Sequence, residues 1–260
     1  MPKVASGEQM RSAGRLLQVL KSFRRDASSR SLSEISRELD LAPSTVRRLL
    51  ETLEQEGFVK YSPDGSRYTL HHEVVRLASV ALAGASFVQA AAPILDRLNQ
   101  EVGETVQISI RDRDNVVLLD TRHSPHLLKI FHAIGHRYPA YKGSAAGKVM
   151  LAWLKREDLL EILPKEDRWE AQTARGIRSR AQLLRALDEV RKRGFGVNDR
   201  ETEENVWSVA APVRDRSGRV FAAVNVPCPA SRLSDEAKRV IAEKVVDAAS
   251  TISETLPFVA

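Results

Sequence analysis

The feature that most restricts the fold of this chain is the order of elements predicted within residues 14–70. Apolar residues recur at helical spacing over 14–23. After a polar stretch, Ser31 and Glu34 have the spacing of a capping box, in which a hydroxyl and a carboxylate bind free N–H groups at a helix start. The Asp40–Pro43 segment predicts a tight break after this second helix, because the residue before proline is pushed out of helical geometry.

A third helix is predicted over Ser44–Gln55, with Gly57 as its C-cap. The face opposite its apolar positions holds small hydroxyls and paired arginines: Ser44, Thr45, Arg47 and Arg48. Arginine can bind guanine O6 and N7 with two hydrogen bonds, and serine, threonine and a helix N-terminus can hold phosphate. The pattern therefore favours a DNA-recognition helix, although an isolated arginine pair would equally suit a solvated face.

Two β-rich runs, residues 58–61 and 67–70, flank a Pro-Asp-Gly turn and predict a hairpin. Three helices followed by a hairpin is the order of a winged helix-turn-helix. Lys60 and Arg67 fall on the hairpin strands, where we expect them to contact phosphates. Residues 1–70 are therefore predicted to be a DNA-binding domain whose partner is a double-stranded operator.

The charge distribution gives mild support to this interpretation. The net charge is +6, and residues 1–70 hold 12 Lys/Arg against 9 Asp/Glu. About a quarter of the chain thus carries half of the positive surplus. A basic balance permits a polyanionic partner without demanding one.

Residues 71–86 predict a linker helix with apolar side chains around most of its circumference. Two contact faces would explain that pattern, one toward its own domain and one toward a partner chain. A two-fold dimer would let two recognition helices read a pseudo-palindrome. The alternative is a helix buried within one chain.

Residues 87–260 predict a second domain in which helices and strands alternate. We expect helices over 87–102, 144–154, 157–163 and 182–193 and from Ser234 onward, and strands over 104–110, 116–121, 127–133, 207–213 and 220–226. This order favours an α+β domain, a curved and mostly antiparallel sheet with helices on it. Such a domain naturally forms a pocket between sheet and helices.

Several blocks of the chain resemble the IclR family of regulators. They are residues 134–152, which run from Ile134-Gly to Leu151-Ala, the block Arg193–Glu201, and Val209–Gly218 leading to Pro229–Glu236. The resemblance extends over nearly the whole chain, from about Ser12 to Leu256. It implies a GAF-like effector-binding domain, a homodimer or dimer of dimers (a homotetramer), and a repressor or activator that responds to a small organic or aromatic acid.

The resemblance also implies an effector site made of a loop with the helix start after it and several strand positions: Ser144, Ala145, Ala146, Gly147, Asp199, Ser208, Asn225 and Pro227. Some relatives have cysteine where this chain has Ser208, and serines where it has Asn225 and Pro227. These differences favour an acid other than, or larger than, a glyoxylate-like ligand. The residues support the site independently, because two alanines leave space at a helix start whose N–H groups suit a carboxylate.

Three other motifs of the sequence do not indicate a separate function. The stretch Gly143–Lys148 lacks the spacing of a phosphate-binding loop. The clustered His123, His126, His132 and His136 could bind zinc, but scattered surface imidazoles are the better interpretation. The acidic run that contains Asp199, Glu201, Glu203 and Glu204 suits an exposed loop.

We expect no catalysis, metal or cofactor, because the sequence shows no ordered nucleophile, base and orienting group. A ligand-processing enzyme or a protein-interaction module that carries the same N-terminal domain stays open as an alternative. The single cysteine, Cys228, fits a reducing compartment, and the chain start has no apolar signal core. Its apolar runs are too short to span a bilayer, so we expect a cytoplasmic protein that does not enter the membrane.

Overall fold

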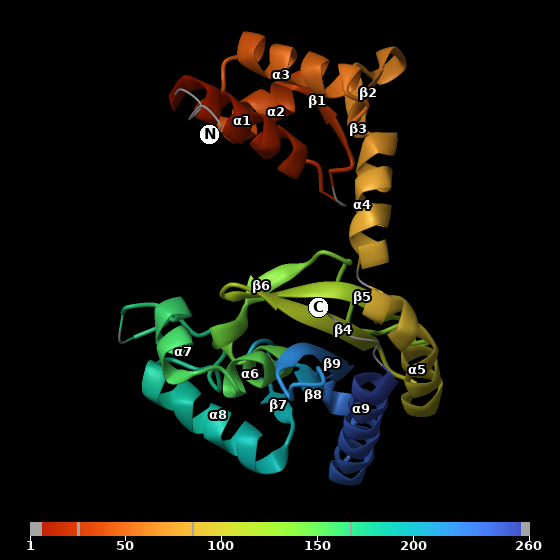
Figure 1. Cartoon of the computed structure of the whole chain (residues 1–260), viewed down its shortest axis with the longest axis vertical. Helices are drawn as coiled ribbons and strands as arrows, with labels where there is room; N and C mark the ends of the chain where they lie inside the picture. Colours follow the sequence, from red (N-terminus) through yellow and green to blue (C-terminus); the bar gives the residue numbers. More distant parts are fainter. Residues whose placement is uncertain (1–6, 25–26, 85, 167, 256–260) are drawn as a thin grey trace. The chain divides into compact units, whose positions relative to one another are not determined.

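The computed structural model describes residues 7–24, 27–84, 86–166 and 168–255 (Figure 1). The chain divides into two compact units, Met1–Ala85 and Ser86–Ala260. Helix α4, which covers most of the predicted linker, is the last element of the first unit. Within the described residues, none of the helices combines the length and the apolar character needed to cross a membrane.

The first unit has the predicted winged helix-turn-helix order with one added strand. Its elements are α1 (Gly7–Lys21), β1 (Ser29–Ser31), α2 (Leu32–Leu39), α3 (Pro43–Gln55), β2 (Val59–Ser62), the short 3-10 turn Pro63–Gly65, β3 (Arg67–Leu70) and α4 (His72–Gly84). The added strand β1 pairs with β3, so the sheet order is β1-β3-β2. The capping box at α2 is present, since the Ser31 hydroxyl accepts from the Glu34 backbone N–H and the Glu34 carboxylate accepts from the Ser31 backbone N–H.

The core of the first unit forms where the apolar faces of the three helices meet the hairpin. It contains Val19, Ile35, Val46, Leu49, Leu50, Leu53 and Val59. Four of these lie on α3 at helical spacing, so the opposite face of α3 must turn to solvent. The amphipathic pattern of the sequence thus decides which side of α3 is free to meet a ligand.

The second unit is an antiparallel sheet with helices on it, which confirms the α+β class. Its elements are α5 (Ser86–Val102), β4 (Val106–Asp112), β5 (Asn115–Arg122), β6 (Arg137–Pro139), the 3-10 turn Ala140–Lys142, α6 (Ala145–Ala152), α7 (Arg156–Ile162), α8 (Arg180–Arg193), β7 (Gly196–Asp199), β8 (Val206–Arg214), β9 (Val220–Pro229), the 3-10 turn Ala230–Arg232 and α9 (Asp235–Thr255). The strand order is β6-β5-β4-β9-β8-β7.

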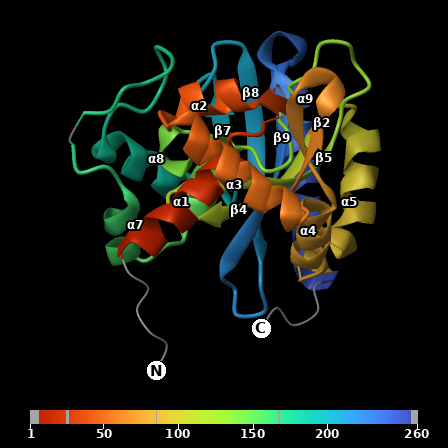
Figure 2. The ribbon, with the colours of Figure 1, turned by 90° about the horizontal axis from the view of Figure 1, so that it is seen from above.

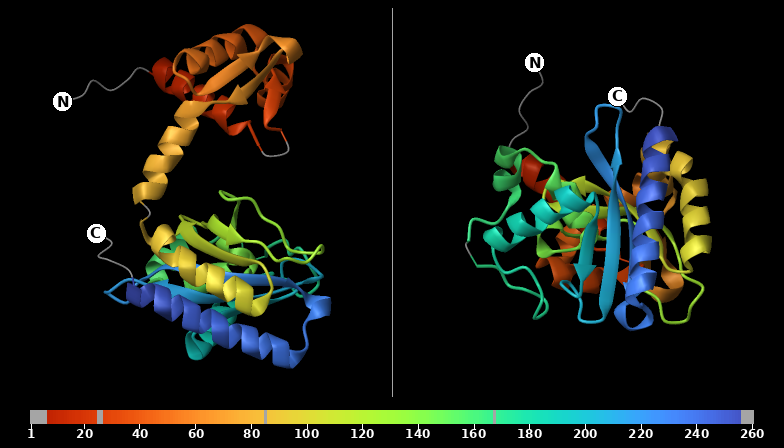
Figure 3. Two further views of the ribbon diagram at one scale, coloured as in Figure 1. Left: turned by 90° about the vertical axis from the view of Figure 1, so that its right-hand side faces the viewer. Right: turned by 90° about the horizontal axis from the view of Figure 1, so that it is seen from below.

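The helices of the second unit form two groups that pack against the sheet. Helices α5 and α9 run side by side (Figure 3), and α9 packs against β8 and β9. Helix α6 packs against β7, β8 and β9 and against α8. The core around α6 includes Ala210 and Ala223, one from each strand of the long β8–β9 hairpin, whose turn projects at the bottom of Figure 2.

The strand predicted over 127–133 is wrong, because this segment has no ladder pairing. Side chains bind its backbone instead: the Thr105 hydroxyl donates to the Ile130 carbonyl (3.1 Å), and the Arg232 guanidinium donates to the Leu128 carbonyl (2.6 Å). The sheet ends on the short β6, which pairs with β5. Residues 123–136 are therefore a loop, called the pocket loop below.

Candidate functional site

The exposed face of α3 carries the residues predicted to bind DNA. Ser44, Arg47 and Arg48 are exposed, and Thr45 is half-buried. The N-cap residue Ala42 has no side chain that could bond the first-turn N–H groups, and Pro43 starts the helix. An uncapped helix start with small hydroxyls and arginines beside it can hold a phosphate and read base edges.

The two residues predicted on the wing differ in their surroundings. Lys60 on β2 is exposed. Arg67 on β3 donates to the Ser29 carbonyl (2.6 Å) and to the Glu34 carboxylate (2.8 Å). The backbone N–H of Ser31 first, and then Arg67, hold the pKa of Glu34 below its ordinary value. Arg67 therefore ties β3 to α2, and a phosphate contact by Arg67 would have to share its guanidinium with these partners.

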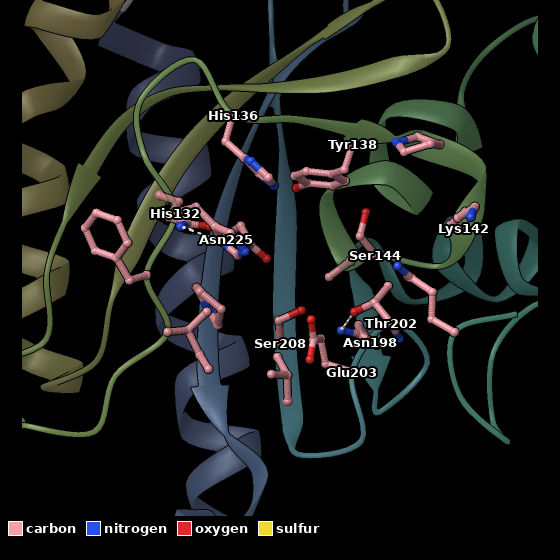
Figure 4. A pocket seen from close by; sticks show the side chains of 18 of the residues that line it. His132, His136, Tyr138, Lys142, Ser144, Asn198, Thr202, Glu203, Ser208 and Asn225 are labelled. Carbon is pink, nitrogen blue, oxygen red and sulfur yellow. Dashed lines mark hydrogen bonds between the residues drawn. The ribbon is translucent and has the colours of Figure 1, made fainter. Parts of the chain in front are cut away.

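The second unit contains a cavity of about 530 Å³ above the sheet (Figure 4). Its lining comes from β4, the pocket loop, β6 with the 3-10 turn after it, the start of α6, the segment between α7 and α8, β7 with the segment after it, β8 and β9. The lining residues are Gln107, Lys129, Ile130, Phe131, His132, His136, Tyr138, Pro139, Lys142, Ser144, Ala145, Gln172, Asn198, Thr202, Glu203, Val206, Ser208, Asn225 and Pro227. Amides, hydroxyls and basic groups make up most of its polar lining.

Strand register explains why the polar residues of the sheet share this cavity. Asn225 lies opposite Gln107 on one side and opposite Ala210 on the other. Directly paired residues point to the same face of a sheet, and residues two apart along a strand share a face. Ser208 therefore faces the same way as Ala210, which packs in the core around α6. The sheet face under α6 is the floor of the pocket.

The structure brings together five of the eight residues predicted for effector binding. Those that line the cavity are Ser144, Ala145, Ser208, Asn225 and Pro227. Ala146 and Gly147 are not among the lining residues and are buried one step further along α6. Asp199 is also absent from the lining and forms an ion pair with Arg175 (2.5 Å).

Asn198 lines the cavity in the place predicted for Asp199. Asn198 pairs with Ser208 across the β7–β8 ladder, so both side chains face the pocket, whereas Asp199 points to the opposite face. The Asn198 amide also donates to the Thr202 hydroxyl (2.9 Å). A difference of one residue along a strand thus decides which polar group reaches the cavity.

Two of the histidines interpreted as scattered surface side chains line the pocket. The rings of His132 and His136 stack with their centroids 4.9 Å apart, and the Tyr138 ring lies 5.7 Å from His136. Burial, and then the charge of His136, lower the pKa of His132. The position of these two histidines directly before the predicted effector loop is the feature of the sequence that indicates a place in the pocket. Among the described residues, His, Cys, Asp and Glu form no group of three that could hold a metal ion.

Three side chains at the pocket floor form a hydrogen-bonded series. The Asn225 amide donates to Gln107 Oε1 (3.0 Å), and Gln107 Nε2 lies 3.3 Å from His132 Nδ1. Asn225 Oδ1 is buried and has no hydrogen-bond partner among the residues that the structure describes. Since an unpartnered buried acceptor is costly, a ligand group is its natural partner.

The start of α6 closes the other side of the pocket. Ser144 is its N-cap and accepts from the Gly147 backbone N–H (3.0 Å). Tyr138 forms a hydrogen bond with Ser144, and burial raises the pKa of Tyr138 to about 12. The tyrosine therefore stays a neutral hydroxyl and adds no negative charge beside Ser144, whereas the Glu203 carboxylate also lines the cavity.

A buried ion pair anchors α6 from behind the pocket. The Lys148 ammonium donates to the Val197 carbonyl (2.5 Å) and to the Glu201 carboxylate. Burial lowers the pKa of Lys148 and raises that of Glu201, and the attraction within the pair opposes both shifts. The pair joins the helix of Ser144 to the segment that carries Thr202 and Glu203, two residues of the lining.

Comparisons with known proteins agree for both units. Residues 80–254 match the family described as the bacterial transcriptional regulator IclR C-terminal domain, and residues 12–63 match the IclR helix-turn-helix domain. The HTH-type transcriptional regulator KdgR of Escherichia coli is 31% identical over 227 residues, which cover 87% of this chain and 86% of that protein.

Two solved structures are similar over most of their length. A putative transcriptional regulator from Rhodococcus has a TM-score of 0.83 and 33% identity, with 95% of this chain and 98% of that chain covered. An IclR homologue from Microbacterium hydrocarbonoxydans, solved in complex with 4-hydroxybenzoate, has a TM-score of 0.82 and 22% identity, with 94% and 98% covered. The latter likeness concerns the fold alone.

Proposed function

Because this chain belongs to the IclR family of transcriptional regulators, we propose that α3 reads an operator while the pocket of the second unit takes a small organic or aromatic acid. The single observation that carries this proposal is the cavity of about 530 Å³ with its buried, unpartnered Asn225 acceptor. We propose binding without turnover, which makes the protein a regulator and not an enzyme. Because genomic DNA is its partner, we place its action in the cytoplasm.

A symmetric dimer suits this function. Two copies of α3 held by a two-fold axis would read the two halves of a pseudo-palindromic operator. Helix α4 supports the dimer, since it exposes Leu77 with 45% of its surface accessible. A dimer of two such dimers is the corresponding tetramer. The expected DNA complex therefore contains two chains on one operator, with one chain on each half-site.

The decisive experiment is a titration of the full-length protein against DNA fragments from its own genomic neighbourhood, at two salt concentrations and with a panel of carboxylic and aromatic acids. Sequence-specific binding that one acid alters would support both halves of the proposal. Weak binding that ignores sequence and vanishes with salt would contradict the operator assignment. Chemical conversion of a bound acid would contradict the assignment as a regulator without turnover.

Replacing either arginine of α3 should weaken operator binding. Arg47→Ala or Arg48→Ala removes a base contact worth about 1–3 kcal/mol, which is roughly a 5- to 150-fold loss of affinity. Fluorescence anisotropy with the operator measures the loss. The matched control is Arg97→Ala, which removes the same charge from an exposed position on α5 of the second unit. If the α3 variants bind as tightly as the control, α3 is not the recognition helix.

The effector carboxylate is proposed to lie at the start of α6. Ser144 and Ala145 line the cavity there, and Lys142 adds a positive charge beside them. The helix N-terminus contributes partial positive charge for the same anion. The amides and hydroxyls of the opposite wall would bind the polar groups on the remainder of the acid. The 4-hydroxybenzoate of the Microbacterium homologue, a hydroxylated aromatic acid, is consistent with this arrangement.

Asn225→Ala should weaken the effector response and leave DNA affinity nearly unchanged. The variant removes a buried hydrogen-bonding group and leaves Gln107 Oε1 without its donor, so we expect a roughly 10-fold or larger loss of effector affinity. Isothermal titration calorimetry with the acid found in the panel measures it. Asp199→Asn is the control, because Asp199 does not line the cavity. Equal loss of effector and operator affinity would indicate misfolding instead.

A further inference from the structure

We propose that His132 decides, through Gln107, whether Asn225 presents a hydrogen-bond acceptor or a donor to the effector, so that an anionic group placed at Asn225 binds together with one proton. The inference rests on the proposed function only in taking the cavity as the effector site. The hydrogen-bonded series itself, called the amide relay below, belongs to the free protein. It comprises His132, Gln107 and Asn225.

The amide relay joins three parts of the chain that meet at the pocket floor (Figure 4). Gln107 lies on β4, Asn225 lies opposite it on β9, and His132 reaches them from the pocket loop. Gln107 and Asn225 are almost fully buried, with 3% and 6% of their surfaces exposed. Water therefore has little access to the two amides, and each of their polar groups depends on a neighbour or a ligand.

The observed arrangement is that of a neutral His132. Gln107 Oε1 accepts from the Asn225 amide, so Gln107 Nε2 must face His132 Nδ1 and donate to it. A ring nitrogen can accept only when it carries no proton, so the proton of the neutral ring lies on Nε2. At the far end, Asn225 Oδ1 is the atom without a partner. The pocket thus offers an acceptor at Asn225.

Protonation of His132 reverses the donor and acceptor roles along the amide relay. With a proton on Nδ1, the ring and Gln107 Nε2 would be two donors facing one another. Rotation of the Gln107 amide by 180° presents Oε1 to the ring and Nε2 to Asn225, whose amide must rotate in turn. The oxygen and nitrogen ends of an amide have nearly the same shape, so the reversal needs no backbone movement. Asn225 Nδ2, a donor, is then the atom without a partner.

The two states select different ligand groups. A carboxylate or keto oxygen can only accept, so at Asn225 it fits the protonated relay, whereas a hydroxyl can donate to Oδ1 of the neutral relay. The wrong pairing leaves two buried acceptors or two buried donors in contact, which is costly. Lys129 and Lys142 line the same cavity and favour an anion. An effector with a second anionic group should therefore take up a proton on binding, whereas one that presents a hydroxyl should not.

The groups around the relay favour the neutral form of His132. The ionisable groups that line the cavity are His132 and His136, Lys129, Tyr138, Lys142 and Glu203. The residues contributed by β4 and β9, namely Gln107, Asn225 and Pro227, carry no ionisable group. Burial and the charge of His136 both lower the pKa of His132 below 6.5. Only a bound anion in the pocket would then favour the imidazolium at neutral pH.

The test is a pH titration of the full-length protein by nuclear magnetic resonance without any effector. The protein is deuterated and uniformly labelled with ¹⁵N, and its histidine rings keep their carbon-bound protons. We expect the side-chain amide resonances of Gln107 and Asn225 to shift together with the His132 ring, with one midpoint below 6.5. The Asn198 amide, which is bonded to Thr202, should not follow that midpoint.

Three variants separate the relay from a general change of environment. Gln107→Met keeps the length of the side chain and removes the amide, so Asn225 should lose its response while His132 still titrates. Gln107→Glu provides only acceptor atoms, so the midpoint of His132 should rise. His136→Gln removes the neighbouring imidazole, so the coupled shift should persist at a higher midpoint. Unchanged backbone resonances of α9 show that each variant is folded.

Two results would overturn the relay. In the first, the Asn225 amide does not respond while His132 titrates in the unchanged protein. In the second, the response of Asn225 persists in Gln107→Met or disappears in His136→Gln. Because no effector is present, the titration is independent of the proposed function. A relay that titrates as expected in a protein whose pocket binds none of the acids would contradict the effector assignment alone.

Discussion

Lys148→Met should lower the free energy of unfolding of the second unit by roughly 3–5 kcal/mol, as expected when one partner of a buried ion pair is removed. The side chains of Lys148 and Glu201 are 5% and 21% exposed, so water can replace the lost ammonium only in part. The Val197 carbonyl also loses its donor. The segment with Thr202 and Glu203 would lose its link to α6, so effector affinity should fall as well.

Urea denaturation followed by circular dichroism measures the loss of stability, and a double variant provides its control. Lys148→Met combined with Glu201→Leu removes both charges, and replacement of a buried pair by apolar groups is often close to neutral. The double variant should therefore be more stable than Lys148→Met alone. If the double variant loses at least as much stability as the single one, packing of the lysine stem and not the charge explains the effect.

The loss of stability in Lys148→Met should depend on pH in a defined direction. Burial raises the pKa of Glu201, and the variant lacks the ammonium that opposes this shift. The folded state then favours the protonated carboxyl more strongly than the unfolded chain does, so stability falls as pH rises from about 4.5 through the raised pKa. The difference in stability between Lys148→Met and the unchanged protein should consequently shrink as the pH is lowered toward 4.5.

Gly147→Ala should destabilise the second unit by roughly 3 kcal/mol, the upper part of the range for an overpacked core. A Cβ at this position would overlap with the Ala140 carbonyl oxygen and lie 2.7 Å from Ser144 Oγ. Alanine usually stabilises a helix interior relative to glycine by about 0.5–1 kcal/mol, so only this close approach explains a loss. The start of α6 would move away from Ala140, and the effector should bind more weakly.

Thermal and urea unfolding measure the effect of Gly147→Ala, and calorimetry measures the effector affinity. Gly14→Ala is the matched control, because Gly14 lies within α1 and a Cβ there meets nothing within 4 Å. That variant should be neutral or more stable by up to about 1 kcal/mol. If Gly147→Ala resembles the control in stability and in effector binding, the contact between α6 and Ala140 does not restrict the position of the helix.

The outward face of α3 could be predicted well because it depends on local structure. Helical spacing of the apolar residues of α3 decides which side chains are buried, and Arg47 and Arg48 fall on the other side. The capping box of Ser31 and the turn after β2 likewise act over a few residues. The strand β1 was not predicted, because three residues give too little periodicity and its stability depends on pairing with the distant β3.

The lining of the cavity could be predicted only in part. The residues at the start of α6 and on the β8–β9 hairpin follow from the family resemblance, and five of the eight line the cavity. Asp199 does not, because its neighbour Asn198 occupies the strand position that faces the pocket. Within the pocket loop, the sequence predicts a strand over 127–133 because its apolar residues suit one. The structure has a loop there, in which Thr105 and Arg232 donate to backbone carbonyls.

The sequence by itself thus determined the class of the fold, the order of most of its elements and the outward face of α3, because these depend on residues a few positions apart. Only the tertiary structure decided that Gln107 and Asn225, 118 positions apart, share a hydrogen bond and that His132 completes the relay. The physical reason is that alternation along a strand shows which residues share a face, whereas the pairing of β4 with β9 decides which residues lie beside one another.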